Sequence, residues 1–364
     1  MKAKKTSLYS SHVDMKGNMV NFGGYLLPTH YSSIKEEHLA VRKSAGLFDV
    51  SHMGEILIEG VNSESFLQYI TTNRVDTLCY GSAQYSIICN EKGGILDDIL
   101  IYKMQNSYML VVNASNKQKI LNWLNQHAFK NIKIRDISDE TGLIAIQGPK
   151  SLEIITDTFK VDMELSYYKF LEKKVNDIDL IISRTGYTGE LGFELFMPKN
   201  NIKYFWDSLL KKGKNRGLRA AGLGCRDTLR MEMKFSLYGN DLNESINPIE
   251  AGLGWLVKFD KGDFIGKNKL KVIKNNLKLK SICIEMVDKA IPRKDYQIFF
   301  KGTNIGKVTS GTMSPSLGKG IAIAMVNIKF TKVGYELMVD IRGKQKKAIV
   351  IKSPFYKLGT MLDK

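Results

Sequence analysis

The chain has 364 residues, of which 54 are lysine or arginine and 37 are aspartate or glutamate, giving a formal net charge of +17 at pH 7. Its 43% hydrophobic and 25% charged residues are those of an ordinary globular protein of two or three domains. No stretch approaches the roughly 20 apolar residues of a membrane span, and the N-terminus lacks an apolar signal core, so we predict a cytoplasmic protein with no membrane partner.

Several classes of ligand site are not expected. The four cysteines form no CxxC pair and the five histidines are dispersed, so we expect no metal and no disulfide framework. Neither GxGxxG after a strand nor GxxxxGK[ST] occurs. The lysines are spread widely without a basic, aromatic-interleaved stripe, which favours a solvated surface over nucleic-acid binding. A basic face that steers an acidic protein or a polyanionic ligand stays open.

The first 60 residues predict short strands and turns over 6–34, a helix over 34–45 and a strand at 55–58. Gly46 is a plausible C-cap for that helix. His52 lies at the entry to the strand, between apolar residues. Because no acidic residue is near it in sequence, we interpret it as structural.

A hairpin is the central feature of the next segment. We predict a helix at 63–70 with Asn62 as N-cap, and strands at 84–89, 95–102 and 108–112. Asn and paired glycines at 90–94 tolerate positive φ and therefore predict a turn just before the strand at 95–102. The two strands that follow this turn form the hairpin.

Two adjacent carboxylates, Asp97 and Asp98, interrupt an otherwise apolar strand. Successive strand side chains point to opposite faces, so at most one of the two enters any given site. A buried carboxylate needs a partner or a cavity. The alternative is that both cap the preceding turn.

Helices and strands alternate over the following segment. We predict helices from 115 or 116 to 127, at 151–159 and at 202–212, and strands at 143–147, 178–183 and 191–197. Glu194 lies on the last strand, flanked on its face by Gly192 and Phe196. A small neighbour beside an acid makes room for a flat ligand, while a salt bridge at the rim is the alternative.

A helix predicted at 225–233 places Arg226 and Arg230 on one face. One of them could pair with Glu194 or with a ligand carboxylate, since arginine suits bidentate contacts. The alternative is that both pair with Asp227 or Glu232 on a solvated surface.

The last third of the chain changes character. We expect 236–255 to be a long ordered loop that ends in a helical turn at 249–253, and the lysine-rich 258–280 to be a linker with a helix. Short alternating strands over 281–356 then predict a small antiparallel barrel or sandwich.

Seven segments together resemble one family, the T protein (aminomethyltransferase) of the glycine cleavage system. In chain order they are NFGGYLLPTHY, AGLFDVSHMGEI, NEKGGILDDILIY, RTGYTGELGFEL, CRDTLRMEMKFSLYGND, NPIEAGLGW and VTSGTMSPSLGKGIA. The resemblance covers nearly the whole chain, and the combination is specific although no single motif is.

The resemblance implies an α+β fold of three domains around a central tetrahydrofolate channel. Two of these have antiparallel sheets and the third is a C-terminal β-barrel. The boundaries expected are an N-terminal folate-binding region at 1–140, partly interleaved with a second folate-binding segment at 141–257, a linker at 258–280 and the barrel at 281–364.

The reaction that the resemblance implies releases ammonia and passes a one-carbon unit to tetrahydrofolate, giving methylenetetrahydrofolate. The donor is the aminomethyl group on the dihydrolipoyl sulfur of a partner, the lipoylated H protein. The basic surface would draw in polyglutamylated folate and an acidic H protein.

The family's catalytic aspartate corresponds to Asp98, which would orient the reactive nitrogens of folate and stabilise positive charge on the transferred carbon. Asp97 would be structural. Glu194 matches the pterin-binding glutamate and Arg226 the arginine that binds the folate tail. The other residues that the resemblance places in the folate pocket are Tyr187, Asn113, Tyr85, Met53 and Tyr238.

One departure is Lys357, where bacterial members often have an arginine; a lysine supplies a point charge without bidentate contact. The main alternative function is a tetrahydrofolate-dependent demethylase of the same superfamily, which would not need H protein. A non-catalytic folate-binding protein is a second alternative, but it would not need Asp98.

Overall fold

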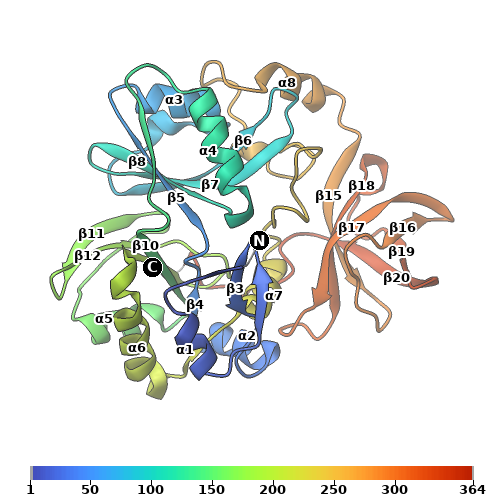
Figure 1. Ribbon diagram of the computed structural model, residues 1–364. Coiled ribbons are helices and arrows are strands. Elements are labelled where there is room, and N and C mark those ends of the chain that lie inside the picture. The colour runs from blue at the N-terminus through green and yellow to red at the C-terminus, as the bar shows by residue number, and fades with distance from the viewer. Residues whose placement is uncertain (1–2, 363–364) are drawn as a thin grey trace.

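A computed structural model of the chain describes residues 3–362. Three lobes surround the middle of the molecule, two built on open sheets and the third on a closed barrel (Figure 1). This arrangement confirms the predicted α+β class, with largely antiparallel sheets and a C-terminal barrel.

The first lobe contains a five-stranded antiparallel sheet in the order β6-β7-β8-β5-β9. Its elements are β5 (Gly54–Glu59), α3 (Ser63–Ile70), β6 (Ser82–Cys89), β7 (Ile95–Lys103), β8 (Ser107–Val112), α4 (Lys117–Gln126) and β9 (Lys133–Asp136). The two helices cover one face, where Phe66 and Ile120 pack with Ile99 and Leu110 of the sheet in one buried cluster.

The predicted turn and hairpin are confirmed. Gly93 has a φ of +82°, in the left-handed region that favours glycine. The side-chain oxygen of Asn90 accepts hydrogen bonds from the backbone nitrogens of Lys92 at 3.0 Å and Gly94 at 2.9 Å. β7 then pairs with β8, with Leu100 opposite Val111.

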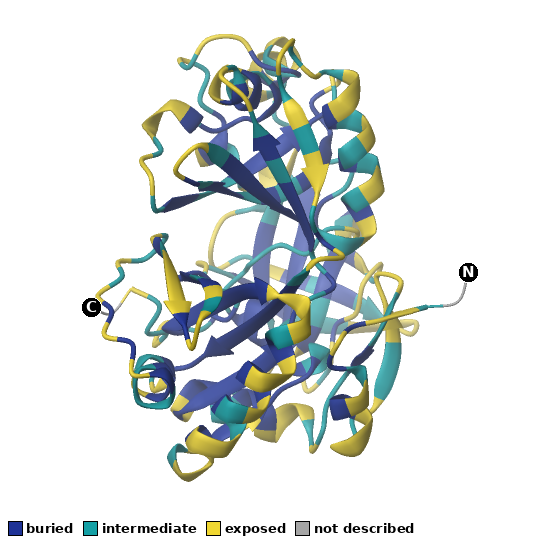
Figure 2. Cartoon of the chain, turned by 60° about the vertical axis from the view of Figure 1, so that its left-hand side comes forward, coloured by how far each residue is buried: buried dark blue, intermediate teal, exposed yellow. Residues whose placement is uncertain are grey.

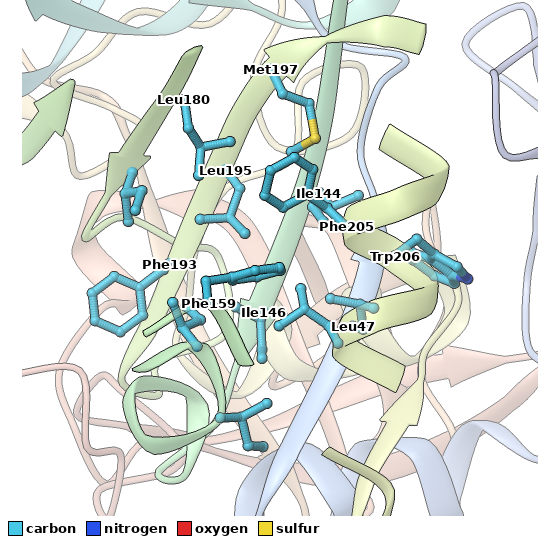
Figure 3. Close-up of a cluster of buried hydrophobic side chains, with 14 of the residues drawn as sticks. Leu47, Ile144, Ile146, Phe159, Leu180, Phe193, Leu195, Met197, Phe205 and Trp206 are labelled. Atoms are coloured by element: carbon cyan, nitrogen blue, oxygen red, sulfur yellow. The ribbon is translucent and has the colours of Figure 1, made fainter. Parts of the chain in front are cut away.

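The second lobe contains a six-stranded sheet in the order β11-β12-β13-β10-β4-β14. Its elements are β4 (Ala45–Asp49), β10 (Thr141–Gln147), α5 (Ser151–Phe159), β11 (Phe170–Val175), β12 (Ile178–Ser183), β13 (Gly192–Pro198), α6 (Ile202–Gly213) and β14 (Leu218–Ala220). Only β4 and β14 are parallel. α5 and α6 cover one face, where Phe159, Phe205 and Trp206 pack against Ile144 and Leu195 (Figure 3).

The other face of this sheet packs against the first lobe. Phe196 and Ala145 belong to one buried cluster with Tyr102 and Val111 of the first sheet. Because side chains alternate along β13, Glu194 shares the face of Phe196. Glu194 therefore points toward the first lobe.

An N-terminal subdomain lies beside the second lobe. Its elements are β1 (Lys4–Lys5), α1 (Tyr9–Asp14), β2 (Met19–Phe22), β3 (Tyr25–Pro28) and α2 (Ile34–Lys43), and α2 packs on α7 (Leu223–Glu232). The prediction that Gly46 caps α2 is wrong: the helix ends at Lys43, and Gly46 lies within β4. Glycine is needed there because a Cβ would press on the side chain of Val41.

The third lobe is a closed six-stranded barrel, which decides between the predicted barrel and sandwich. Its strands are β15 (Leu279–Met286), β16 (Gln297–Phe300), β17 (Thr303–Met313), β18 (Gly320–Asn327), β19 (Glu336–Ile341) and β20 (Lys344–Ile351). Segment 258–280 contains α8 (Lys267–Asn275), and Phe264 and Leu270 are buried against the first lobe. The domain boundaries at 140, 257 and 280 stay predictions.

Two predicted helix caps are corrected. Asn62 makes no side-chain cap and instead donates to the carbonyl oxygen of Lys130. Asn116 precedes α4, but its side chain makes no cap either.

The turn predicted at 249–253 is confirmed, since Ala251 N donates to the carbonyl oxygen of Asn247 at 3.0 Å and Leu253 N to that of Pro248 at 2.8 Å; a 3₁₀ helix follows it at Gly254–Leu256. The short 3₁₀ helices are Val75–Thr77, Ala114–Asn116, Lys199–Asn201, Lys214–Arg216, Gly254–Leu256 and Ile328–Phe330.

Burial follows the layers. The central strands of the sheets are buried, and the helices expose their outer sides (Figure 2). Within residues 3–362, no helix has the length and apolar character that crossing a bilayer requires.

Candidate active site

Asp98 lies on β7, on the face that turns toward the second lobe with Leu100 and Tyr102. Its Oδ2 accepts a hydrogen bond from the Tyr85 hydroxyl at 2.8 Å, and its Oδ1 accepts one from Asn113 Nδ2 at 2.9 Å. Burial raises the pKa of Asp98, while these two hydrogen bonds act in the opposite direction. Each carboxylate oxygen is thus fixed by one donor and keeps acceptor capacity for a ligand.

Asp97 has a different environment. It is fully buried, on the face that it shares with Ile99. Its oxygens accept from Asn113 N at 3.0 Å, Asn113 Nδ2 at 2.8 Å and Asn116 Nδ2 at 2.6 Å. Asn113 follows the end of β8, so its amide reaches both aspartates. Asp97 therefore holds the segment between β8 and α4.

Glu194 is the second carboxylate of the interface between the lobes, and it is buried, with 8% of its surface exposed. The Thr185 hydroxyl donates to its Oε2 at 2.5 Å, and burial raises its pKa. The expected room beside Gly192 is filled, because a Cβ on that glycine would collide with the side chain of Gln147. The small residue thus admits a protein side chain rather than a ligand.

Arg226, on α7, has its guanidinium 4.7 Å from the centre of the Tyr187 ring. Within residues 3–362 it forms no ion pair with Glu194, although its charge acts to lower the pKa of that carboxyl. Tyr187 is fixed in turn, since its hydroxyl donates to the carbonyl oxygen of Ser236 at 2.5 Å. The charge of Arg226 is therefore positioned by an aromatic ring.

Arg230 is a structural residue. It is buried and pairs with Asp227 at 2.9 Å and with Asp241 at 2.7 Å. Its Nη2 also donates to Ser310 of the barrel at 2.9 Å. The predicted pairing with Asp227 is confirmed, but the predicted solvated surface is wrong because this arginine joins α7 to the barrel.

The remaining predicted residues, Met53, Tyr238 and Lys357, have different environments. Met53 is half-buried and packs against the cluster between the two lobes. Tyr238 donates to the carbonyl oxygen of Ile95 at 3.1 Å and accepts from Lys119 at 2.7 Å, at the beginning of β7. Its hydroxyl is thus held away from Asp98. Lys357 is exposed.

Three further residues at the site were not predicted. Thr185 orients Glu194, and it lies inside the segment RTGYTGELGFEL, of which only Tyr187 and Glu194 were predicted to bind folate. Tyr168 lies close enough to Glu194 for the two to interact electrostatically, and it has a φ of +63° that no sequence pattern reveals. Trp255 is 61% exposed, with its ring centroid 6.4 Å from that of Tyr85.

The arrangement suits a particular chemistry. The carboxyl of Glu194 can accept hydrogen bonds from a flat heterocycle with an N–H edge, and Arg226 can bind an anionic group. Asp98 can stabilise positive charge that develops on a reacting atom. Among residues 3–362, no group of three His, Cys, Asp or Glu side chains is placed to bind a metal ion.

Two family models match the chain in succession. The GCVT N-terminal domain matches residues 8–261, and the glycine cleavage T-protein C-terminal barrel domain matches residues 280–357. The two matches together include every residue of the site described above.

Relatives of known name match over nearly their full length. An aminomethyltransferase of Bacillus mycoides (strain KBAB4) is 46% identical over 359 residues, which cover 97% of this chain and 98% of that protein. An aminomethyltransferase of Bacillus cereus (strain B4264) is 45% identical with the same coverage. The crystal structure of the glycine cleavage system aminomethyltransferase T from Bartonella henselae superposes with a TM-score of 0.92 at 31% identity, covering 98% of this chain and 99% of that one.

Proposed function

The chain belongs to the glycine cleavage T-protein family of aminomethyltransferases, and from that membership we propose how its own residues perform the family's reaction. The protein is an aminomethyltransferase: it transfers the methylene carbon from the aminomethyl-dihydrolipoyl group of H protein to tetrahydrofolate, releases ammonia and gives 5,10-methylenetetrahydrofolate. The observation that carries the residue assignment is Asp98, a half-buried carboxylate fixed by Tyr85 and Asn113 in the interface that also holds Glu194.

Folate binding would use both lobes. Glu194 would accept hydrogen bonds from the N–H edge of the pterin, and Thr185 would hold its carboxyl in place. Arg226, supported by Tyr187, would bind the carboxylates of the p-aminobenzoyl-glutamate tail. The pocket would be completed by Tyr85, Asn113, Met53 and Tyr238.

The chemical step exchanges two bonds at one carbon. A folate nitrogen attacks the aminomethyl carbon, the carbon–sulfur bond breaks and the dihydrolipoyl sulfur keeps the electron pair and takes a proton. The second folate nitrogen then displaces the amine; each folate nitrogen gives up its proton, one to the sulfur and one to the amine, which leaves as ammonia. Positive charge develops on the carbon in both steps, and Asp98 would stabilise it while orienting the two nitrogens. Asp97 would hold Asn113 in place.

The alternatives receive less support. The full-length relatives reported above are named aminomethyltransferases, which favours H protein over a small methyl donor. The fixed carboxylate of Asp98 is a group that a purely folate-binding protein would not need. The lysine-rich surface supports attraction of an acidic H protein and of polyglutamylated folate. The cytoplasmic location stays a prediction.

The test is ammonia release from aminomethylated, lipoylated H protein, with and without tetrahydrofolate. Wild type should release ammonia much faster with folate, and Asp98→Asn should lose at least tenfold in kcat, or roughly 1.4 kcal/mol of transition-state stabilisation. The matched control is Asp162→Asn at an exposed position, which should keep wild-type rates. A wild type that binds folate but is inert on H protein would refute the proposed donor.

A further inference from the structure

Resting on the proposed function, we propose that the last segment of the chain positions the folate site without touching folate. The segment is 355–361, named here the C-terminal strap. It holds 184–191, named here the site loop, which carries Thr185 and Tyr187. The strap residues that do this are positioning residues for the reaction.

The strap returns from the barrel to the second lobe. Its last described residues lie beside the second lobe, where Met361 N donates to the carbonyl oxygen of Gly189 just before β13. Phe355 is buried with Met231 of α7 and Ile321 of the barrel. Tyr356 N then donates to the carbonyl oxygen of Glu232 at 2.9 Å, and the Tyr356 ring lies 4.1 Å from the guanidinium carbon of Arg42. The strap is thus anchored before it reaches the site loop.

The strap and the site loop meet backbone to backbone. A Cβ on Gly359 would collide with the carbonyl oxygen of Gly189. Two residues further on, Met361 N donates to that same oxygen at 3.2 Å. Gly189 itself has a φ of +81°, and a Cβ there would collide with the side chain of Met233. Only glycine at both positions permits this approach.

Thr360 joins the strap to the site loop through its hydroxyl. The hydroxyl donates to Glu190 Oε2 at 2.6 Å and accepts from Leu191 N at 3.0 Å. Thr360 N donates to the same carboxylate oxygen at 3.0 Å. The other oxygen of Glu190 accepts from Arg42 Nη1 at 2.7 Å, and Arg42 Nη1 also donates to the Thr188 carbonyl at 2.8 Å. The loop is therefore held from two sides.

The opposite end of the site loop presents the ligand-binding groups. Thr185 fixes the carboxyl of Glu194, and the Tyr187 ring supports Arg226. A small cavity is lined by residues of the site loop together with Met361 of the strap. Loss of the strap contacts would free the loop to move toward that cavity. A displacement of an ångström or less at such a site is enough to weaken binding.

Linkage gives this proposal a second consequence. If the strap contacts favour folate binding, then folate binding must stabilise the strap contacts by the same factor. The backbone amides that cross between the strap and the site loop, Leu191 N and Met361 N, should therefore exchange with solvent more slowly when folate is bound.

The first experiment measures the Kd of tetrahydrofolate and two-substrate kinetics for strap variants. Thr360→Val removes the hydroxyl but keeps the shape, so it should raise the Kd and the KM for folate about tenfold, with little change in kcat or in the KM for H protein. Thr360→Ser keeps the hydroxyl and should bind within about twofold of wild type. Gly359→Ala should resemble Thr360→Val, because its Cβ pushes the strap off the loop.

The control is Leu362→Ala, just beyond the strap and 68% exposed, which should leave folate binding unchanged. A Thr360→Val protein with wild-type folate affinity would overturn the proposal. So would equal losses for both substrates, which indicate a general loss of folded protein. A wild type that is inactive on H protein counts against the proposed function instead, and not against the strap.

The second experiment needs no variant. Hydrogen–deuterium exchange of wild type, with and without saturating tetrahydrofolate, should show slower exchange at Leu191 and Met361 when folate is bound. Val339, in the barrel strand β19, provides the comparison and should change less. Unchanged exchange at both Leu191 and Met361 would also overturn the proposal, even if the Thr360 variants failed to fold.

Discussion

Asp97 and Asp98 are neighbours in sequence with opposite environments. Alternation along β7 sends Asp97 to the helix-covered face and Asp98 to the interface between the lobes. Asn113 contacts both, since it lies at the end of the adjacent strand. One residue thus connects the structural carboxylate to the proposed catalytic one, and a change at Asn113 is expected to affect both stability and catalysis.

Glu55 is a buried carboxyl that the proposed mechanism does not use. It lies on β5 with 1% of its surface exposed, and neither of its side-chain oxygens has a hydrogen-bond partner within residues 3–362. Burial raises its pKa well above the ordinary value of 4.5. The folded protein therefore keeps a proton that the unfolded chain loses above about pH 4.5, and Glu55 costs stability progressively as pH rises.

We expect Glu55→Leu to raise the free energy of unfolding at neutral pH by about 1–3 kcal/mol, because it removes an unpaired polar group. The gain should grow as pH rises from about 4.5 toward the raised pKa of the folded state. Urea unfolding across pH 4–8 measures both effects. Glu164→Leu, at an exposed position, is the control. A Glu55→Leu protein that is less stable than wild type at every pH would contradict the assignment.

At the scale of elements, the asparagine side chains at helix N-termini bond to residues distant in sequence instead of capping their own helices. Asn116 stands where a cap is expected before α4, yet its amide donates to Asp97 of β7. The side chain of Asn62 likewise donates a hydrogen bond to the carbonyl oxygen of Lys130 and does not cap α3. A buried carboxylate competes successfully for an amide because an unpaired charge in the core is more costly than an uncapped helix end.

The segment before α8 is held by one lysine. Lys261 Nζ donates to the backbone carbonyl oxygens of Gln68 at 2.6 Å, Thr71 at 2.6 Å and Asn73 at 2.7 Å, around the end of α3. Lys261→Met would leave these carbonyls unpaired. We expect it to lower the free energy of unfolding by about 2–3 kcal/mol, measured by urea denaturation, whereas Lys269→Met at an exposed position should have little effect. Equal effects of the two substitutions would show that the hydrogen bonds of Lys261 contribute nothing to stability.

At the scale of the whole molecule, α7 is the element that joins the lobes. Arg226 faces the proposed folate site and Arg230 binds the barrel through Ser310. At its end, Glu232 accepts from Arg42 of α2 at 2.8 Å and from Ser314 of the barrel at 2.5 Å. A single helix thus fixes the barrel relative to the site.

Although burial opposes ionisation, His38 and Arg42 lower the pKa of Glu232 to about 2, below its ordinary value of 4.5. The stability it contributes is therefore present above pH 4.5 and lost as pH falls toward 2. We expect Glu232→Gln to lower the free energy of unfolding by about 1.5–3 kcal/mol at neutral pH, since it removes one of the two carboxylate partners of buried Arg42 and leaves only Glu190. The variant should also lose less stability than wild type between pH 4.5 and 2.

Calorimetry of both proteins over this pH range measures the effect. The control is Glu336→Gln, in an exposed pair with Lys347, which should change stability by less than about 1 kcal/mol. If the two substitutions were equally mild, the network at Glu232 would not hold the barrel.

The sequence by itself determined many of the strands, most helices, the hairpin turn and an all-β C-terminal domain, but it missed β4, β9, β11 and β14 and left a barrel or a sandwich open. The features that it determined depend on side-chain periodicity and on glycine backbone freedom, which act over a few residues. It also carried the family resemblance. Only the tertiary structure decided that Asp98 shares its interface with Glu194, that Gln147 fills the space beside Gly192, and that Thr360 holds the site loop. Those contacts join residues far apart in the chain, and no local pattern encodes which distant groups meet when the lobes pack together.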